Sequence, residues 1–262
     1  MGNWGRALIT GGSTGIGAAL ADVFAEHGHD LVLVARHSDR LQAKGAAIEK
    51  AFGVKVTCIP EDLADPAGAR RLQEAVAAQG LRVQHLVNNA GIGHYGKFAA
   101  SDLATELKMI QLNSASVVEL TKRFLQPMIE NRSGRVLNVA STAAFVPGPW
   151  MSVYYATKAF VLSFSEAIDY ELKPSGVRVT ALCPGPTHSE FKVRAGSQRS
   201  RLFEAFVMDA APVARAGYDG MMSGRQVVIP GVKNKLIPIA VRAIPRSMVA
   251  TLSHRAARPS EE

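Results

Sequence analysis

The chain has 262 residues, 47% of them hydrophobic, and 30 lysines and arginines against 22 acidic residues give it a net charge of +8. This length and apolar content allow a large core and favour one α/β domain over two small ones. The sequence contains no low-complexity tract, no repeat of solenoid period and no stretch near the roughly 20 uninterrupted apolar residues of a membrane span.

The cysteines and the first residues indicate the compartment. Cys58 and Cys183 each lie in an apolar, strand-like run, which favours buried free thiols in a reducing compartment over a disulfide or a metal site. Residues 1–6 lack the charged and apolar regions of a signal peptide. We therefore expect a cytoplasmic protein that binds no metal.

Short apolar runs alternate with segments of helical periodicity along most of the chain. Strands are expected at residues 7–10, 31–35, 54–59, 85–87, 135–140, 177–183 and, at the sheet edge, 226–229. Helices are expected at residues 16–26, from Ser38 or Asp39, at 66–78, from Ser101 or Asp102, at 114–130 and at 152–173. Continuously apolar strands alternating with helices predict a parallel sheet covered on both faces, which is a Rossmann-like, doubly wound, three-layer αβα fold of about seven strands. Residues 1–262 are expected to form one domain, with an irregular, lid-like insertion at 187–224 and a basic extension at 232–262.

A glycine-rich turn joins the first predicted strand to the first helix. Its sequence is Thr10-Gly11-Gly12-Ser13-Thr14-Gly15-Ile16-Gly17. The missing Cβ atoms of Gly11, Gly15 and Gly17 permit a tight turn and close approach of a pyrophosphate, while the helix N-terminus offers unpaired N–H groups. We expect this turn, including Ser13, Thr14 and Ile16, to bind a dinucleotide. A purely structural turn is the alternative, and the sequence lacks the Gly-Lys-Ser/Thr of a P-loop.

The end of the second strand distinguishes the two nicotinamide cofactors, because a carboxylate there binds a ribose hydroxyl and a cation accommodates a 2′-phosphate. Arg36, with Ser38 as a hydrogen-bonding helper, is the candidate phosphate ligand, which favours NADP(H). The alternative is a solvated Arg36 with Asp39 on the ribose. Asp62 and Leu63, just after the third strand, are expected to bracket the adenine.

A serine, a tyrosine and a lysine suggest the chemistry. Tyr154 and Lys158 are four residues apart on a predicted helix and so share one face, where the ammonium would lower the phenol pKa and make Tyr154 a general acid or base. Ser141, at a strand end, could hydrogen-bond a substrate oxygen. This set suits interconversion of a carbonyl and an alcohol. By itself Tyr-x-x-x-Lys also occurs by chance, with the tyrosine as a packing residue. The rival Tyr155 would lie about 100° further round the helix.

Taken together, these pieces resemble the short-chain dehydrogenase/reductase family over roughly residues 6–187, and within it a branch of bacterial NADP-linked reductases. The matching residues are Thr10-Gly11-x-x-x-Gly15-Ile16-Gly17, Asp62, Asn88-Asn89-Ala90-Gly91, Asn113, Ser141, Tyr154-x-x-x-Lys158 and Pro184-Gly185. The resemblance implies a catalytic tetrad of Asn113, Ser141, Tyr154 and Lys158.

The resemblance also implies the remaining cofactor contacts and the assembly. It places Asn89, Ala90 and Gly91, together with Tyr154 and Lys158, against the cofactor, and Pro184, Gly185 and Thr187 at the nicotinamide. It assigns Asn113 a water that links Lys158 to solvent. It further implies a homodimer or homotetramer built through the helices at 114–130 and 152–173.

The substrate is expected to meet a largely apolar wall. Ser141, Ala143, Phe145, Trp150 and Tyr154 are the candidate substrate contacts. Other candidates are Pro147, Met151, His94 and Tyr95, with Phe191, Leu202, Phe203 and Phe206 as a lid. This wall favours a lipophilic ketone, aldehyde or secondary alcohol, whereas ordinary packing of these side chains is the alternative.

The basic tail allows three interpretations. It carries seven basic residues from Arg225 to Arg258 and an apolar series from Ile237 to Leu252. Packing over the substrate mouth or a partner subunit is favoured, peripheral membrane contact is second, and nucleic-acid binding is not expected, because stacking aromatics and a known motif are absent.

The sequence therefore predicts an NADP(H)-dependent oxidoreductase that acts on a lipophilic carbonyl or alcohol. The competing hypothesis is an NADP(H)-sensing regulatory protein that keeps the fold and acts by binding a partner.

Overall fold

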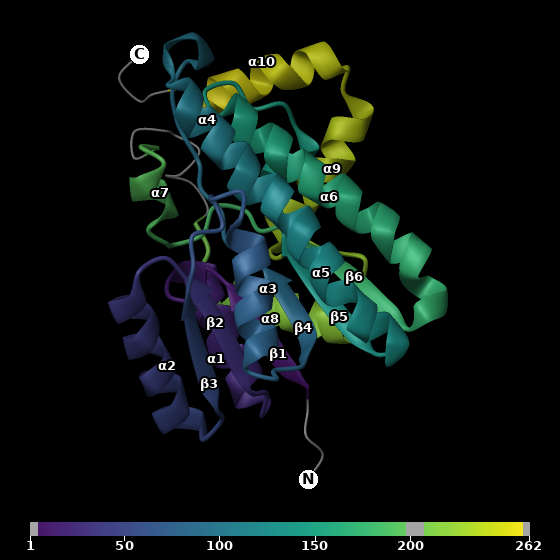
Figure 1. The fold of residues 1–262 in the computed structure, drawn as a ribbon. Coiled ribbons are helices and arrows are strands. Elements are labelled where there is room, and N and C mark those ends of the chain that lie inside the picture. Colours follow the sequence, from purple (N-terminus) through teal and green to yellow (C-terminus); the bar gives the residue numbers. More distant parts are fainter. Residues whose placement is uncertain (1–4, 198–206, 259–262) are drawn as a thin grey trace.

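The computed structural model describes residues 5–197 and 207–258. Its strands form one parallel sheet in the order β3-β2-β1-β4-β5-β6-β7 (Figure 1). The strands are β1 (Arg6–Thr10), β2 (Leu31–Ala35), β3 (Val56–Pro60), β4 (Val83–Asn88), β5 (Gly134–Val139), β6 (Val177–Leu182) and β7 (Val227–Val228). The strand order reverses between β1 and β4, so the Rossmann-like, doubly wound fold predicted from the sequence is confirmed.

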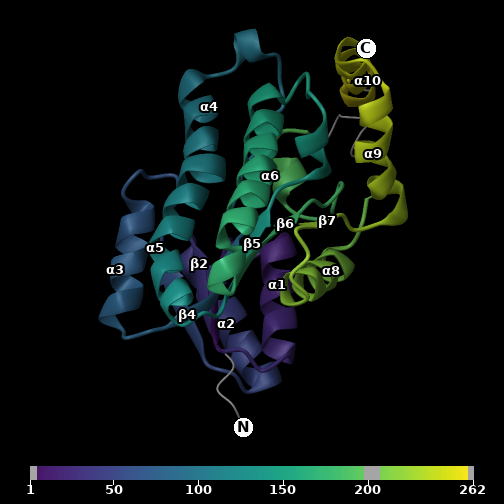
Figure 2. The ribbon, with the colours of Figure 1, turned by 90° about the vertical axis from the view of Figure 1, so that its right-hand side faces the viewer.

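Helices cover both faces of this sheet. They are α1 (Gly15–Glu26), α2 (Ser38–Phe52), α3 (Gly68–Ala78), α4 (Leu103–Ile110), α5 (Ser116–Glu130), α6 (Ser152–Leu172), α7 (Phe191–Arg194), α8 (Ala210–Met222), α9 (Val232–Ala243) and α10 (Arg246–Ala257). Figure 2 shows α3, α5 and α6 on one side of the sheet and α1 and α8 on the other. This arrangement leaves the carboxyl ends of the strands open at one edge.

Two apolar clusters hold the layers together, one on each face of the sheet. One joins side chains of α1, α2 and α8, including Leu20, Phe24, Leu41 and Val213, to Ile9 and Leu33. The other joins α3 and α5, through Leu72, Leu120 and Phe124, to Leu8 and Val32. Neighbouring residues of β1 and β2 therefore point to opposite faces, and both faces are apolar because both are buried.

Two local expectations were wrong. Residues 187–224 are not irregular throughout, because α8 packs against α1 with Val213, Ala214 and Met221 buried in the core. Ser38 and Asp39 do not cap α2, whose N-cap is His37. The helix expected from Ser101 or Asp102 is present as α4 and is capped by Asp102, which accepts from the Thr105 N–H at 2.9 Å. A π-helical turn, Gln111–Ala115, joins it to α5, the helix expected at 114–130.

The C-terminal extension forms two helices beside the open edge of the sheet (Figures 1 and 2). On α9, Asn234 is buried and its amide donates to the Pro230 carbonyl at 2.8 Å. On α10, Val249 and Ala257 are buried. In the described part of the chain, no helix is both long and apolar enough to cross a membrane.

A cluster of aromatic and imidazole rings lies in the core between α1 and α8. His29 bonds through Nε2 to the Tyr218 hydroxyl at 3.0 Å, and its ring lies 4.8 Å from that of His85. His85 is 4% exposed, and its Nδ1 has no partner among the described residues. Burial, reinforced by His29 and Arg135, lowers the pKa of His85 to about 3.

This histidine should make the fold sensitive to acid. The unfolded chain has a histidine pKa of about 6.5, so the folded form binds fewer protons, and the contribution of neutral His85 to stability is complete above pH 6.5 and is lost as the pH falls toward 3. We expect His85→Phe to reduce the loss of unfolding free energy between pH 7.5 and 4.5 by about 2 kcal/mol, measured by urea denaturation. The exposed His37, changed to Phe, is the control. Equal pH dependence in the wild type and His85→Phe would contradict this assignment.

Candidate active site

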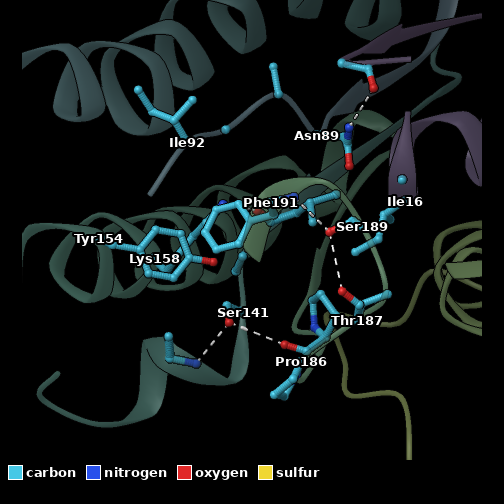
Figure 3. A pocket seen from close by; sticks show the side chains of 18 of the residues that line it. Ile16, Asn89, Ile92, Ser141, Tyr154, Lys158, Pro186, Thr187, Ser189 and Phe191 are labelled. Atoms are coloured by element: carbon cyan, nitrogen blue, oxygen red, sulfur yellow. Dashed lines mark hydrogen bonds between the residues drawn. The ribbon is translucent and has the colours of Figure 1, made fainter. Parts of the chain in front are cut away.

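A pocket opens at the carboxyl ends of β1, β4, β5 and β6 (Figure 3). It gathers sequence-predicted residues from segments far apart in the chain. They are Gly11, Thr14, Gly15, Ile16, Asn89, Ala90, Gly91, Ser141, Ala143, Tyr154, Lys158, Pro184, Gly185 and Thr187. The pocket therefore brings together the glycine-rich turn and three members of the expected tetrad.

The glycine-rich turn has the shape that a pyrophosphate needs. Gly11 and Gly15 have φ values of +66° and +57°, which a residue with a Cβ rarely adopts. A Cβ on Gly17 would lie 2.2 Å from the Gly11 carbonyl oxygen, so only glycine lets α1 start so close to β1. The N-cap of α1, Thr14, makes no side-chain cap bond. The first N–H groups of α1 thus lie at the pocket with the positive end of the helix dipole, a suitable site for a dinucleotide phosphate.

Side-chain hydrogen bonds hold this turn to the end of β4. The Thr10 hydroxyl accepts from the N–H groups of Asn89 and Ala90, both at 3.0 Å. The Asn89 amide in turn donates to the Thr10 carbonyl at 2.9 Å and to the Gly11 carbonyl at 3.3 Å. Below them, Asn88 donates to Asn138 on β5 at 2.9 Å. The turn at residues 88–91 is therefore tied to both neighbouring strands.

Ser141 follows β5 and is the N-cap of a short 3₁₀ turn, Thr142–Phe145. Its hydroxyl accepts from the Ala143 N–H at 3.1 Å and lies 3.3 Å from the Pro184 carbonyl, to which it donates (Figure 3). These two contacts fix the oxygen at the pocket wall. The hydroxyl can rotate its proton from Pro184 toward a substrate oxygen without moving the Oγ atom.

Tyr154 and Lys158 lie on the first turns of α6 and face the pocket. The Lys158 Nζ is 5.8 Å from the centre of the Tyr154 ring and donates to the Val139 carbonyl at 2.7 Å. Burial lowers the pKa of Lys158 to about 8. Tyr155 also lines the pocket, but its ring packs against Gly148, and burial raises its pKa to about 12.

The expected lowering of the Tyr154 pKa is not found. Burial raises the pKa of Tyr154 well above its usual value, and the neighbouring Ser141 hydroxyl opposes this only in part. Lys158 does not offset this effect of burial, because its ammonium donates to the Val139 carbonyl and lies near the ring of Tyr154, with no hydrogen bond to the phenol oxygen among the described residues. In this arrangement Tyr154 holds its proton firmly at neutral pH.

Asn113 lies behind the pocket, in the π-helical turn between α4 and α5. Its amide donates to the Ile92 carbonyl at 2.9 Å and accepts from the Ile92 N–H at 3.0 Å. It also donates to the Thr157 hydroxyl at 3.2 Å. A Cβ on Gly91 would lie 3.2 Å from Asn113 Oδ1 and 3.6 Å from Lys158 Nζ. Asn113 therefore positions the segment after β4 next to Lys158, and π turns of this kind are frequent at functional sites.

The residues expected at the adenosine end lie outside the pocket lining. Arg36 and Ser38 are exposed where β2 meets α2, and Ser13 is half-buried in the glycine-rich turn. Asp62 accepts from the Ala64 N–H at 3.0 Å, and Leu63 is buried in the core. Arg36 and Ser38 follow the carboxyl end of β2, and Asp62 and Leu63 follow that of β3.

The expected substrate wall is only partly present. Ala143 and Met151 line the pocket, as does Phe191, whose ring centre is 5.1 Å from that of Tyr154. Phe145 instead packs beneath the pocket against the cluster that contains Val161 and Ala181. The side chains of Leu202, Phe203 and Phe206, expected in the lid, lie outside the described residues.

Trp150 is also outside the pocket lining, because its ring is part of an aromatic stack with Tyr95 and His254. Its ring lies 5.8 Å from that of Tyr95 and 6.1 Å from that of His254 on α10. The Tyr95 hydroxyl donates to the Ala257 carbonyl at 2.6 Å. The inner side of α10 therefore packs against the segments that carry Tyr95 and Trp150. His94 pairs with Glu106 at 3.1 Å.

The sequence reasoning missed several pocket residues. They include Ile92, Val139, Thr142, Pro186, Ser189, Glu190 and Arg194. Val139, the last residue of β5, and Ile92, in the segment after β4, could have been indicated by their positions at the carboxyl ends of strands. The loop after β6 crosses the groove, where Glu190 pairs with Arg40 on α2 at 3.1 Å. No sequence pattern links these two residues, 150 positions apart.

Known proteins with the same architecture agree with this geometry. The short chain dehydrogenase family pattern matches residues 6–200. The very-long-chain 3-oxoacyl-CoA reductase of Bos taurus is 34% identical over 188 residues, which are 70% of this chain and 59% of that protein. The chain thus spans less than two thirds of the length of this relative.

Two solved structures are similar over nearly their whole length. A short-chain dehydrogenase from Sphingobium yanoikuyae in complex with NADPH superposes with a TM-score of 0.83 at 33% identity, covering 92% of this chain and 94% of that one. The bulky-bulky ketone specific alcohol dehydrogenase from Comamonas testosteroni superposes with a TM-score of 0.78 at 28% identity, covering 92% and 93%. With its fold, its glycine-rich turn and this match, the chain belongs to the short-chain dehydrogenase family, a family of oxidoreductases.

Proposed function

We propose that this protein uses NADPH to reduce a bulky, lipophilic ketone or aldehyde, and that the same residues serve the reverse oxidation of a secondary alcohol. The convergence of Ser141, Tyr154 and Lys158 on one pocket carries the proposal. The rest of the wall beside Tyr154 is largely apolar, with Ala143, Met151 and Phe191. The names of the reductase and the bulky-ketone dehydrogenase found among its relatives support this substrate class.

The residues divide the work of the reaction. The bound nicotinamide supplies the hydride when a carbonyl is reduced. Ser141, held by the Ala143 N–H, hydrogen-bonds the carbonyl oxygen as its negative charge grows. Tyr154, kept neutral by its raised pKa, gives its proton to that oxygen. The Lys158 ammonium, 5.8 Å from the centre of the Tyr154 ring, would turn from the Val139 carbonyl to stabilise the phenolate that remains.

The cofactor proposal rests on the cation at the end of β2. Arg36 is exposed where a 2′-phosphate would lie, and the NADPH complex of the Sphingobium yanoikuyae dehydrogenase supports the same cofactor. We further propose a homodimer or homotetramer built through α5 and α6, in keeping with the family.

Tyr154→Phe should remove most of the activity, because the proton donor is lost and the ring is kept. We expect kcat/KM for ketone reduction to fall by about 10²–10⁴, measured by NADPH absorbance on a panel of bulky ketones. The matched variant Tyr155→Phe should stay within a few-fold of the wild type. If Tyr154→Phe retained full turnover, the acid/base role would be wrong. If the wild type bound NADPH and reduced no member of the panel, a binding protein would be the better interpretation.

The ammonium of Lys158 should appear in the pH profile. Because its pKa is lowered to about 8, the free enzyme carries this charge below pH 8 and loses it above. We expect log kcat/KM for reduction to be flat from pH 6.5 to 7.5 and to fall above pH 8. Lys158→Arg keeps its charge at all these pH values and should lack this inflection, whatever its absolute rate. A wild-type profile that stays flat to pH 9.5 would refute the assignment.

Arg36→Ser should change the choice of cofactor. A charge-assisted bond to the 2′-phosphate is lost, so the Kd for NADPH should rise by about tenfold or more while that for NADH stays unchanged. Fluorescence titration with both cofactors measures this. Arg82→Ser, at an exposed arginine just before β4, is the control. Tighter binding of NADH than of NADPH by the wild type would overturn the cofactor assignment.

A further inference from the structure

Helix α9 turns an apolar face toward solvent. The side chains of Val232, Leu236 and Ile239 are 79%, 59% and 66% exposed. Their spacing of four and three residues places them on one face of the helix. A helix on the surface of a globular protein usually buries such a stripe against the core. On α9 the stripe is on the outside.

The opposite face of α9 holds the helix in place. Asn234 is 8% exposed and lies against Gly185 of the turn after β6, where a Cβ on that glycine would come within 2.6 Å of the Asn234 amide. Ile237 and Val241 are half-buried beside it. Asn234 therefore attaches α9 to the domain, and the apolar face of the helix on the opposite side remains exposed to solvent.

Helix α10 extends the same kind of surface. Met248 and Leu252 are 55% and 49% exposed and lie four residues apart, whereas Val249 and Ala257 on the inner face are buried. The two helices follow each other at the open edge of the sheet (Figure 2). We call the exposed side chains Val232, Leu236, Ile239, Met248 and Leu252 the tail face.

Cations border the tail face. At about 100° per residue, Lys235 and Arg242 fall on one side of the α9 stripe and Lys233 on the other. All three are exposed, as is Arg255 on α10. Between Arg225 and Arg258 the sequence contains seven basic residues and no acidic one. An outward apolar stripe flanked by cations is the pattern of a helix that lies in a membrane interface.

From this pattern we infer that the tail face docks on an anionic lipid surface, with the apolar side chains in the headgroup region and the cations on the lipid phosphates. Charge favours this occupant over a second copy of the chain. Two tail faces in contact would bring Lys235 and Arg242 of both copies together, with no carboxylate between Arg225 and Arg258 to offset them.

Docking in this orientation would place the substrate mouth beside the lipid. The inner side of α10 contacts Trp150 through His254, and its Ala257 carbonyl accepts from Tyr95. Tyr95 in turn packs against the cluster that contains the pocket residues Ala143 and Met151. A lipophilic carbonyl compound dissolved in the bilayer would then meet the enzyme next to its pocket. This consequence rests on the proposed function, whereas the docking itself does not.

Flotation of the full chain with vesicles tests the proposal without any turnover. We expect the wild type to float with vesicles of phosphatidylcholine and phosphatidylglycerol, more weakly with phosphatidylcholine alone, and less in high salt. Two double variants test the tail face: Leu236→Gln with Ile239→Gln, and Lys235→Glu with Arg242→Glu. Each should bind the anionic vesicles at least about tenfold more weakly than the wild type.

Matched controls distinguish binding through the tail face from nonspecific hydrophobic adsorption and from an effect of net charge. The double variant Lys50→Glu, Lys55→Glu makes the same change of charge at two exposed positions, one in α2 and one just after it. Tyr170→Gln removes a ring on α6 that is 71% exposed. Both should float like the wild type, and thermal melts check that every variant is folded. The proposal fails if the wild type does not float, or if the tail-face variants float as well as it does. It also fails if Leu236→Gln, Ile239→Gln lowers the oligomer mass in sedimentation, because the face would then be a protein contact.

Discussion

The site depends on the hydrogen bonds that hold residues 88–92 at the end of β4. On one side, Thr10 accepts from the N–H groups of Asn89 and Ala90, which fixes the glycine-rich turn. On the other side, the Asn113 amide pairs with both backbone groups of Ile92. One short segment therefore sets the distance between the phosphate end and Lys158. Such buried polar contacts are costly when incomplete, which makes the arrangement rigid.

Burial gives Tyr154 and Lys158 opposite shifts, and these shifts suit proton donation. The pKa of Tyr154 is raised and that of Lys158 is lowered to about 8, both because the low-dielectric pocket disfavours the charged form. A neutral phenol next to a cation is stable before reaction. The growing negative charge on a carbonyl oxygen, and then the phenolate, are what the ammonium would stabilise.

The strand ends, and the gathering of Ser141, Tyr154 and Lys158 at one pocket, could be predicted because they depend on local patterns. Apolar runs, the glycine-rich turn and Tyr154-x-x-x-Lys158 each leave a signal within a few residues. The direction of the Lys158 ammonium could not be predicted, since it depends on the Val139 carbonyl across the fold. The same holds for Trp150, whose place in the stack with His254 is set by how α10 returns over the mouth. The helix α8 was missed because it follows a long stretch without clear periodicity.

The C-terminal helices have two faces with different tasks. Their inner side packs against the domain through Asn234 at Gly185 and through the stack at Trp150, so it needs polar and aromatic contacts of fixed geometry. Their outer side has no such constraint, yet it carries large aliphatic side chains that expose apolar surface at a cost in water. A protein surface free of partners would be expected to carry polar residues there. The combination of this apolar surface with flanking cations therefore argues for a partner that is itself both apolar and anionic, as a lipid surface is.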